Sequence, residues 1–353
     1  MKKIIAIIGS HGLHANYGGW DQLVINLAEK KEKKFRYLIF NSKDSNKDFI
    51  IPSETEVIFM PLKASGIQGI LYDYFSILIS FFKADIFLLL GAQGMPIIYF
   101  FNFFFKKKII VNSGGVEWER EKFGFLAKRY LKLCFDLCFK SANHVIIDND
   151  IYKKYIPLKS LVPYSVIPYG GEINASLELT KEMKIKYPFL NKDYFLSISR
   201  SIQDNQLREV CNAFKKLKFN LVLISNFSHS QYGKSIFDDF SDINNITLID
   251  GLYFKPELDL VRRNCKCYIH THSTCGTAPS LVEMIICNKP IISFDVQQNR
   301  NTLENSGLFF NDFDDLVRII KTTKNFSKYL PKKTVMKKYK WSNIINTYEN
   351  LFK

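Results

Sequence analysis

Gly276-Thr277-Ala278-Pro279-Ser280-Leu281-Val282-Glu283 is a turn, marked by glycine and proline, that opens a short helix. An apolar strand, Tyr268–His270, runs into this turn, and a second one, Pro290–Phe294, follows the helix. Ser280–Cys287 has the apolar spacing of a short buried helix. The amide N–H groups at such a helix start point into the preceding loop and attract phosphate and other anions. Glu283 is placed to accept hydrogen bonds from hydroxyl groups above the loop; the alternative is an ordinary crossover with a solvated glutamate.

The rest of the chain alternates between apolar strands and helices. Strands are predicted at 4–8, 35–41, 57–60, 86–90, 108–112, 144–147, 194–199, 221–225 and 246–248. Helices are predicted at 20–31, 70–82, 126–140, 151–155, 180–186, 207–217, 256–264, 312–322 and 341–352. This order predicts an α/β fold with parallel sheets covered on both faces. The Pro/Gly-rich connection Pro163–Gly171 interrupts the alternation and is the expected domain boundary.

Two doubly wound, Rossmann-like domains facing across a cleft are the simplest architecture for this alternation. We expect an N-terminal domain at 1–168, a C-terminal domain at 169–335, and a closing segment at 336–353 whose helix packs back on the N-terminal domain. Ligands of open parallel sheets bind at the carboxyl ends of the strands. Three loops lie at such ends: Gly12–Gly19, the loop at Arg200, and the loop at Gly276.

The composition is strongly basic. The 353 residues carry a formal net charge of +15, which is spread along the chain. Such an excess suits nucleic acid, anionic lipid or phosphorylated substrates. No zinc-finger, helix-turn-helix or RNP-type pattern accompanies it, and we therefore expect no nucleic-acid partner.

Cysteine usage indicates a reducing compartment. There are seven cysteines, an odd number, and no CxxC pair. The run from Cys265 to Cys275 mixes cysteines and histidines and raises the alternative of a zinc site. Because Cys267 and His270 lie on opposite faces of the predicted strand, these ligands do not converge easily. We expect no metal and no cofactor.

Neither a signal peptide nor a membrane-spanning helix is predicted. The apolar run after Lys2-Lys3 is too short for a signal peptide, and no cleavage pattern follows it. Phe75–Leu90 is broken by Lys83 and Asp85, and Met95–Phe105 is too short to span a bilayer. A cytoplasmic protein is therefore expected.

Two segments combine aromatic and basic residues, Tyr99–Lys108 and Lys128–Lys132. Bulky aromatic side chains beside lysines suit the headgroup boundary of an anionic membrane. This pattern predicts peripheral docking on the inner face of the plasma membrane. The alternative is that Tyr99–Phe105 is a buried helix and Lys106–Lys108 a solvated turn.

Six motifs occur together and in the order of a known enzyme family. They are GLHANYGGW at 12–20, NSGGVEWER at 112–120, YIHTHS at 268–273, GTAPSLVE at 276–283, Phe294-Asp295 and Asn299-Arg300. Through them the chain resembles a GT-B glycosyltransferase of glycosyltransferase family 4, in the branch that includes bacterial rhamnosyltransferases of surface-polysaccharide assembly. The similarity extends from Met1 to the closing helix at 341–352.

The resemblance implies a nucleotide-sugar donor bound mainly by the C-terminal domain, an acceptor held mainly by the N-terminal domain, and retention of anomeric configuration. Arg200 falls at the position of the family's diphosphate-binding arginine, and Glu283 at that of a glutamate that accepts hydrogen bonds from the donor ribose. The implied site consists of catalytic residues Arg200, His272 and Glu117, donor-binding residues Gly18, Gly19, Asn205, His270, Gly276, Thr277, Ser280, Glu283 and Arg300, and acceptor-binding residues His14, Trp118 and Arg120.

Two positions depart from the pattern of the broader family. The broader family has a lysine five residues after the arginine, where this chain has Asn205. It also has a glutamate eight residues before the position of Glu283, where this chain has Cys275. The rhamnosyltransferase branch similarly lacks both. The candidates to supply the missing contacts are His14, His270, His272 and Asn299. Structural readings stay open for several residues: His270 as a satisfied strand-end histidine, Glu117 and Arg120 as a solvated pair, Arg300 as a helix cap, and Asp295 as a strand end.

The expected activity is a retaining hexosyl or rhamnosyl transfer from a nucleotide-sugar to a glycan or polyprenyl-diphosphate-linked acceptor. Departure of the nucleotide builds negative charge on its β-phosphate, and cations and helix-start amides are expected to face it. Two alternatives belong to other classes: a non-catalytic GT-B-like binding module, and a nucleotide-sugar epimerase. Sugar transfer to an acceptor separates both from the expected activity.

Overall fold

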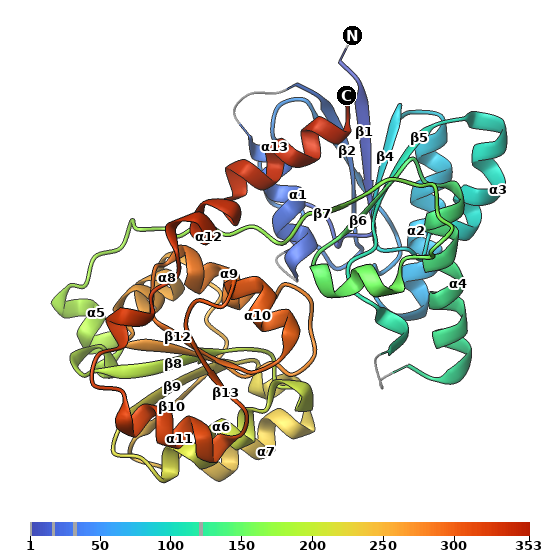
Figure 1. Ribbon diagram of the computed structural model, residues 1–353. Helices are drawn as coiled ribbons and strands as arrows, with labels where there is room; N and C mark the ends of the chain where they lie inside the picture. Colours follow the sequence, from blue (N-terminus) through green and yellow to red (C-terminus); the bar gives the residue numbers. More distant parts are fainter. Residues whose placement is uncertain (1, 16–17, 31–33, 120–122) are drawn as a thin grey trace. The chain divides into compact units, whose positions relative to one another are not determined.

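A computed structural model of the chain describes residues 2–15, 18–30, 34–119 and 123–353. The chain forms two units (Figure 1). The first contains Met1–Tyr169 together with Trp341–Lys353, and the second contains Gly170–Lys340. The first unit is therefore built from two separate parts of the sequence, and the second unit is inserted between them.

The first unit is built on a seven-stranded parallel sheet in the order β3-β2-β1-β4-β5-β6-β7. Its strands are β1 Ile4–Ile8, β2 Arg36–Asn41, β3 Thr55–Phe59, β4 Ile86–Leu90, β5 Lys108–Asn112, β6 His144–Ile147 and β7 Tyr164–Val166. The strand order reverses between β1 and β4, which is the place where open α/β sheets bind ligands.

Helices cover both faces of this sheet (Figure 1). α1 Gly19–Glu29 and α13 Trp341–Leu351 share one apolar cluster with the sheet. α2 Gly66–Phe81, α3 Met95–Phe105 and α4 Phe125–Ser141 share the cluster on the opposite face. Two 3-10 turns, Glu117–Glu119 and Asp150–Tyr155, follow β5 and β6. Apolar residues on both sides of each central strand explain why the strands read as continuous apolar runs.

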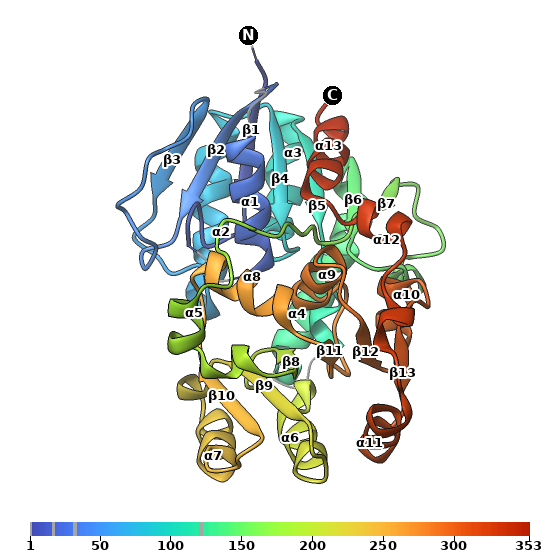
Figure 2. The ribbon, with the colours of Figure 1, turned by 90° about the vertical axis from the view of Figure 1, so that its left-hand side faces the viewer.

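The second unit is built on a six-stranded parallel sheet in the order β10-β9-β8-β11-β12-β13. Its strands are β8 Tyr194–Ile198, β9 Asn220–Ser225, β10 Ile246–Asp250, β11 Cys267–His270, β12 Ile291–Phe294 and β13 Leu308–Phe310. α6 Leu207–Lys215, α7 Gln231–Phe240 and α11 Phe313–Thr322 lie on one face of this sheet (Figure 2). α8 Lys255–Asn264, α9 Pro279–Ile286, α10 Gln297–Leu303 and α12 Lys333–Lys338 lie on the other.

Short elements complete the second unit. α5 Lys181–Lys186 precedes β8, and 3-10 turns lie at Pro188–Asn191, Gln203–Asn205, Phe227–His229 and Phe326–Tyr329. The strand order reverses between β8 and β11. The loops after these two strands are Ser199–Asn205 and Thr271–Ala278, which places Arg200 and the segment that begins at Gly276 at the reversal.

The α/β fold class with two Rossmann-like sheets is confirmed. The expected connection Pro163–Gly171 was wrong in part, because Tyr164–Val166 forms β7, a three-residue edge strand paired with β6. The alternative of a buried helix at Tyr99–Phe105 was also wrong, since Tyr99, Phe100, Phe103 and Phe104 are exposed on α3. Cys134 and Cys138 are core residues of α4.

Candidate functional site

The loops after β8 and β11 are joined by hydrogen bonds. The Asn205 side chain donates from Nδ2 to the Arg200 carbonyl at 2.8 Å. The Thr271 hydroxyl donates to the Asn205 carbonyl, and Gln206 donates to the Thr271 carbonyl at 2.7 Å. Asn205 is thus a buried structural tie that fixes the Arg200 loop against the end of β11. The Arg200 side chain itself is exposed.

Two histidines stack at the end of β11. The ring centroids of His270 and His272 are 4.3 Å apart, with 15° between the ring planes. Burial and the positive field of Arg200 lower the pKa of His272 to about 4. Burial and the neighbouring His272 hold the pKa of His270 well below its usual range, against an opposing contribution from Asn299. Both rings are therefore neutral at pH 7, and each offers one donor and one acceptor nitrogen.

Several buried polar atoms of these rings and of the nearby strand ends have no hydrogen bond of ordinary geometry to a described residue, although Asn299 still acts on His270 through a weaker one. They are Nδ1 and Nε2 of His270, Nδ1 of His272, Oδ1 of Asn299, and the hydroxyl oxygens of Ser199 and Ser225 at the ends of β8 and β9. Asn299 is held in place through its other atom, since Nδ2 donates to the carbonyls of His272 and Phe294 at 3.0 Å each. Buried polar atoms in native proteins are nearly always satisfied, and such a group therefore marks a place for a polar ligand or water.

Glu283 on α9 is held by an arginine that the sequence analysis did not identify. Arg262 on α8 donates from Nη2 to Glu283 Oε2 and from Nη1 to Asp259 Oδ1, the latter at 2.6 Å. Arg262 and Asp259 are buried, whereas the Glu283 side chain keeps 17% exposure. Burial opposes the charge of Arg262, but Glu283 and Asp259 together raise its pKa. The ion pair uses one oxygen of Glu283 and leaves lone pairs on the carboxylate for a hydroxyl donor.

The start of α9 contains three further predicted donor-binding residues. Thr277 is buried, Gly276 and Ser280 are half-buried, and Pro279 is the first helical residue. Ser280 hydrogen-bonds the Tyr268 hydroxyl, which in turn donates to the Ile198 carbonyl at 3.2 Å. Cys275, half-buried, precedes this turn.

Arg300 is already engaged in an ion pair. Its guanidinium forms a bidentate pair with Asp295 through Nε and Nη2, the latter at 2.6 Å from Oδ2. It also lies over the Phe309 ring, 4.3 Å from the centroid. Bidentate pairing and stacking fix an arginine firmly. Binding a phosphate would therefore require Arg300 to share its guanidinium with Asp295.

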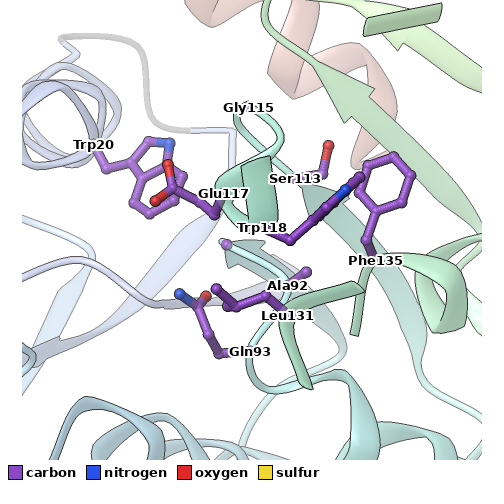
Figure 3. A pocket seen from close by; sticks show the side chains of 10 residues that line it. Trp20, Ala92, Gln93, Ser113, Gly115, Glu117, Trp118, Leu131 and Phe135 are labelled. Carbon is purple, nitrogen blue, oxygen red and sulfur yellow. The ribbon is translucent and has the colours of Figure 1, made fainter. Parts of the chain in front are cut away.

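A hollow lies at the carboxyl ends of the central strands of the first unit (Figure 3). Its lining is Trp20, Gly91, Ala92, Gln93, Ser113, Gly115, Glu117, Trp118, Leu131 and Phe135. Figure 3 shows the Glu117 carboxylate beside the Trp20 indole, while Trp118 extends toward Phe135. The Trp118 and Phe135 rings meet edge to face with centroids 4.6 Å apart. The hollow thus combines two indoles with a carboxylate and an amide, but its volume of about 20 Å³ admits a water molecule and no sugar ring.

Two glycines make room for the Trp20 indole. Gly91 and Gly114 have φ values of +107° and +62°, where a side chain is strained. A Cβ at Gly114 would lie 3.0 Å from the indole, and one at Gly91 would lie 3.2 Å from it and 2.4 Å from the Gln93 amide oxygen. The indole therefore packs directly on the backbone at the ends of β4 and β5.

The loop between β1 and α1 is pinned by two buried polar side chains. Asp21 accepts hydrogen bonds from the N–H groups of His11 at 2.9 Å and Gly18 at 3.2 Å. Asn41 accepts from the Leu13 N–H at 2.8 Å and donates to the Leu13 carbonyl at 3.1 Å. The Gly18 amide is thus used within the loop, and an anion would have to displace Asp21 or bind the Gly19 N–H.

His14 and Arg120 complete the list of predicted residues. His14 Nε2 lies 3.3 Å from Glu29 Oε1, and its ring packs on Phe49 with centroids 5.0 Å apart. His14 is absent from the lining of the hollow that contains Glu117 and Trp118. Arg120 lies outside the described residues.

The predicted residues therefore form separate groups. Arg200, Asn205, His270 and His272 come together at the β8/β11 reversal, and Glu117 joins Trp118 in the hollow of the first unit. Sequence reasoning missed Arg262, Asp259, Asp21 and Asn41, which position Glu283 and the glycine loop. Over the described ranges, no three His, Cys, Asp or Glu side chains are arranged to hold a metal ion.

Comparison with solved structures identifies the fold as that of the GT-B glycosyltransferases. The sucrose-phosphate synthase (tll1590) of Thermosynechococcus elongatus aligns with a TM-score of 0.77 and 13% identity, over 99% of this chain and 98% of that one. Anabaena Alr3699/HepE in complex with UDP-glucose aligns with a TM-score of 0.74 and 12% identity, over 100% and 99% of the two chains. An E. coli structure described as trehalose-6-phosphate bound with UDP-2-fluoro glucose aligns with a TM-score of 0.67 and 10% identity, over 99% and 96%.

At such low identity these matches establish the fold, and the GT-B expectation is confirmed. In sequence, residues 1–172 match the model of a family described as "Domain of unknown function (DUF1972)". No curated protein matches the chain significantly.

Proposed function

We propose that this protein is a retaining glycosyltransferase that moves a sugar from a nucleotide-sugar to a glycan or lipid-linked acceptor. One observation carries the proposal: a stacked, neutral histidine pair lies beside Arg200 at the strand reversal of the second unit, and its buried ring nitrogens include several without a hydrogen bond of ordinary geometry to a described residue. Ligands of this fold type bind at such reversals. Two of the similar structures are described with UDP-glucose or UDP-2-fluoro glucose bound, which supports a nucleotide-sugar as the donor.

We assign the donor diphosphate to the loops after β8 and β11. The Arg200 guanidinium supplies positive charge at the surface of this group. His272 is neutral, and its imidazole N–H donates to phosphate or sugar oxygens. Glu283, oriented by Arg262, accepts hydrogen bonds from the ribose hydroxyls. Asn205 acts as a positioning residue, because its side chain holds the Arg200 carbonyl.

The reaction breaks the bond between the anomeric carbon and the β-phosphate oxygen, and it forms a bond between that carbon and an acceptor hydroxyl oxygen. The departing β-phosphate gains negative charge, which Arg200 stabilises more strongly in the transition state than in the bound substrate. A phosphate oxygen on the same face accepts the hydroxyl proton, which retains the anomeric configuration. We assign the acceptor to the surface of the first unit around Glu117 and Trp118, because the hollow that these residues line is too small to enclose a sugar.

We infer a deoxyhexose such as rhamnose as the donor sugar, in surface-polysaccharide biosynthesis. The motif resemblance to bacterial rhamnosyltransferases supports this inference. Cys275 also supports it, since a thiol stands where the broader family has a glutamate for sugar hydroxyls. A thiol is a weak hydrogen-bond partner and favours a sugar face with fewer hydroxyl groups.

Two measurements test the proposal. Thermal shift against a panel of UDP-, dTDP- and GDP-linked sugars should reveal the donor, because a ligand of the folded state raises the melting temperature. Incubation of that donor with lipid-linked acceptors should then release the nucleoside diphosphate and yield a product whose linkage NMR can assign. Donor binding without transfer would indicate a binding module, and an altered nucleotide-sugar formed without acceptor would indicate an epimerase. Inversion at the anomeric carbon would refute the mechanism.

A further inference from the structure

Helix α2 carries an exposed apolar stripe on the first unit. Ile67, Leu71 and Phe75 recur at four-residue intervals and are exposed, and Phe82, directly after the helix, is 82% exposed. Residues four apart share one face of a helix. The opposite face of α2, with Tyr72 and Ile77, is buried against the sheet. The exposed stripe is thus a second apolar face of α2, and its side chains are not packed in the core.

Helix α3 repeats this arrangement with larger side chains. Met95 and Ile98 are buried, whereas Tyr99, Phe100, Phe103 and Phe104 are exposed, Phe103 at 78%. α4 adds exposed Phe125, Leu126 and Leu133.

The three helices form one layer on the sheet (Figure 1). Phe82 meets Phe105 edge to face with centroids 5.6 Å apart, which joins the end of α2 to α3. The Tyr74 and Tyr130 hydroxyls, 3.1 Å apart, join α2 to α4. We call these exposed side chains of α2, α3 and α4 the aromatic face. Exposed apolar patches of this extent mark interaction surfaces.

The charges of this layer are almost all positive. Lys106–Lys108 follow α3, and α4 carries Lys128, Arg129, Lys132 and Lys140. Asn102 fixes the lysine turn, since it accepts from the Lys107 N–H at 2.6 Å and donates to the Lys107 carbonyl at 3.0 Å. The acidic residues within α2, α3 and α4 are Asp73, which is buried, and Asp136, which is paired with Lys132.

We propose that the aromatic face docks on an anionic lipid surface. Aromatic side chains beside lysines suit the boundary between headgroups and acyl chains, and the lysines are attracted to anionic headgroups. If two copies of the chain met through this face, their positive charges would repel each other, which disfavours self-association. No helix in the described part of the chain is long and apolar enough to cross a bilayer. The inference goes beyond the proposed function and needs no donor or acceptor.

Vesicle flotation with the full chain tests the proposal. The probes are vesicles of phosphatidylcholine alone and of phosphatidylcholine with about 30 mol% phosphatidylglycerol, at low and at physiological salt. We expect binding to the anionic vesicles, weaker at higher salt. Two variants, F100S/F103S/F104S and K106Q/K107Q/K108Q, should each weaken binding about tenfold or more. Matched controls in the second unit, Y253S/F254S and K321Q/K324Q/K328Q, change exposed residues of the same types and should bind like the unaltered protein.

A reporter variant separates insertion from surface adsorption. Phe103→Trp places an indole on the aromatic face, and brominated lipids should quench its fluorescence when the anionic vesicles bind. Absence of flotation with anionic vesicles at low salt overturns the proposal. Wild-type binding by both variants, or an unquenched reporter in vesicle-bound protein, overturns it as well. Concentration-dependent dimerisation that F100S/F103S/F104S abolishes, without vesicle binding, would assign the face to a protein contact instead.

Discussion

At the scale of single residues, Arg200 gives the most direct test of the proposed donor site. Its guanidinium stands at the end of β8 and lowers the pKa of His272 through its positive charge. Arg200→Ala should lower kcat/KM about 10- to 100-fold, mostly through kcat, because the phosphate charge that it faces grows in the transition state. Steady-state kinetics with the identified donor measures the effect. Arg208→Ala, which removes an arginine paired with Asp239, is the control and should leave kcat/KM unchanged.

Glu283 should contribute to donor binding more than to turnover. Glu283→Ala should weaken nucleotide-sugar binding by about 1–3 kcal/mol, the range for a hydrogen bond to a charged group. Calorimetric titration measures this change. Glu283→Gln keeps an acceptor oxygen at the same distance from the backbone, and its donor affinity should fall less than that of Glu283→Ala. Unchanged donor affinity in Glu283→Ala would refute the ribose role and leave only the ion pair with Arg262.

The lowered pKa of the half-buried His272 predicts a pH dependence of stability. The pKa of His272 is about 4 in the folded protein and about 6.5 in the unfolded chain. As the pH falls from 7 to 5, the unfolded chain gains a proton that the folded protein does not take up. The free energy of unfolding should therefore fall by about 2 kcal/mol from this residue. Urea denaturation of the protein and of His272→Gln at both pH values tests this, since the variant should lose less stability than the unaltered protein.

At the scale of elements, Asp21 is one of the two buried side chains that hold the loop between β1 and α1. Asp21→Ala removes the acceptor for the His11 and Gly18 N–H groups and should lower the free energy of unfolding by about 1–3 kcal/mol. Chemical denaturation measures the loss. Asp44→Ala, which removes an exposed carboxylate paired with Lys63, should change stability by less than about 0.5 kcal/mol. Equal effects of both substitutions would contradict the role of Asp21.

Most strands could be predicted because buried parallel strands are continuous apolar runs. Ile4–Ile8 and Ile86–Leu90 are examples, with matching ends in sequence and structure. β7 was missed because it has three residues and pairs on one edge only. The exposed face of α3 was also not decided by its sequence, since Asn102 alone interrupts the aromatic run Tyr99–Phe105 and a helix that is almost entirely apolar has no polar side to mark the solvent.

The candidate site was predictable only where a loop follows a strand. Such positions include His272 and Glu117, which lie in the motifs, and Arg200, which follows the first strand of the second unit. The pairing of Glu283 with Arg262 was not predictable, because it joins residues of two different helices that are 21 positions apart in the sequence. The same holds for Asp21 and Asn41, whose partners are backbone atoms of a loop.

At the scale of the whole molecule, the first unit should need α13 for stability. α13 buries Ile344, Ile345 and Tyr348 against the core of α1 and the sheet, and Tyr348 accepts a hydrogen bond from Asn112 at 2.6 Å. A fragment of residues 1–169 should therefore lack a cooperative melting transition, and a peptide of residues 341–353 should restore it. The fragment 170–340 contains its whole sheet and should melt cooperatively by itself. Calorimetry of the fragments tests this, and a cooperative transition of 1–169 alone would contradict it.

Because the first unit consists of two separate segments of the chain, the order of synthesis determines which unit can fold first on the ribosome. Residues 170–340 are made between the two parts of that unit, and about 170 residues take roughly 10–30 s to translate. During this time the apolar surface that α13 will cover stays open to chaperones and to other nascent chains. The unit that begins later in the sequence is therefore the first one that can complete its core.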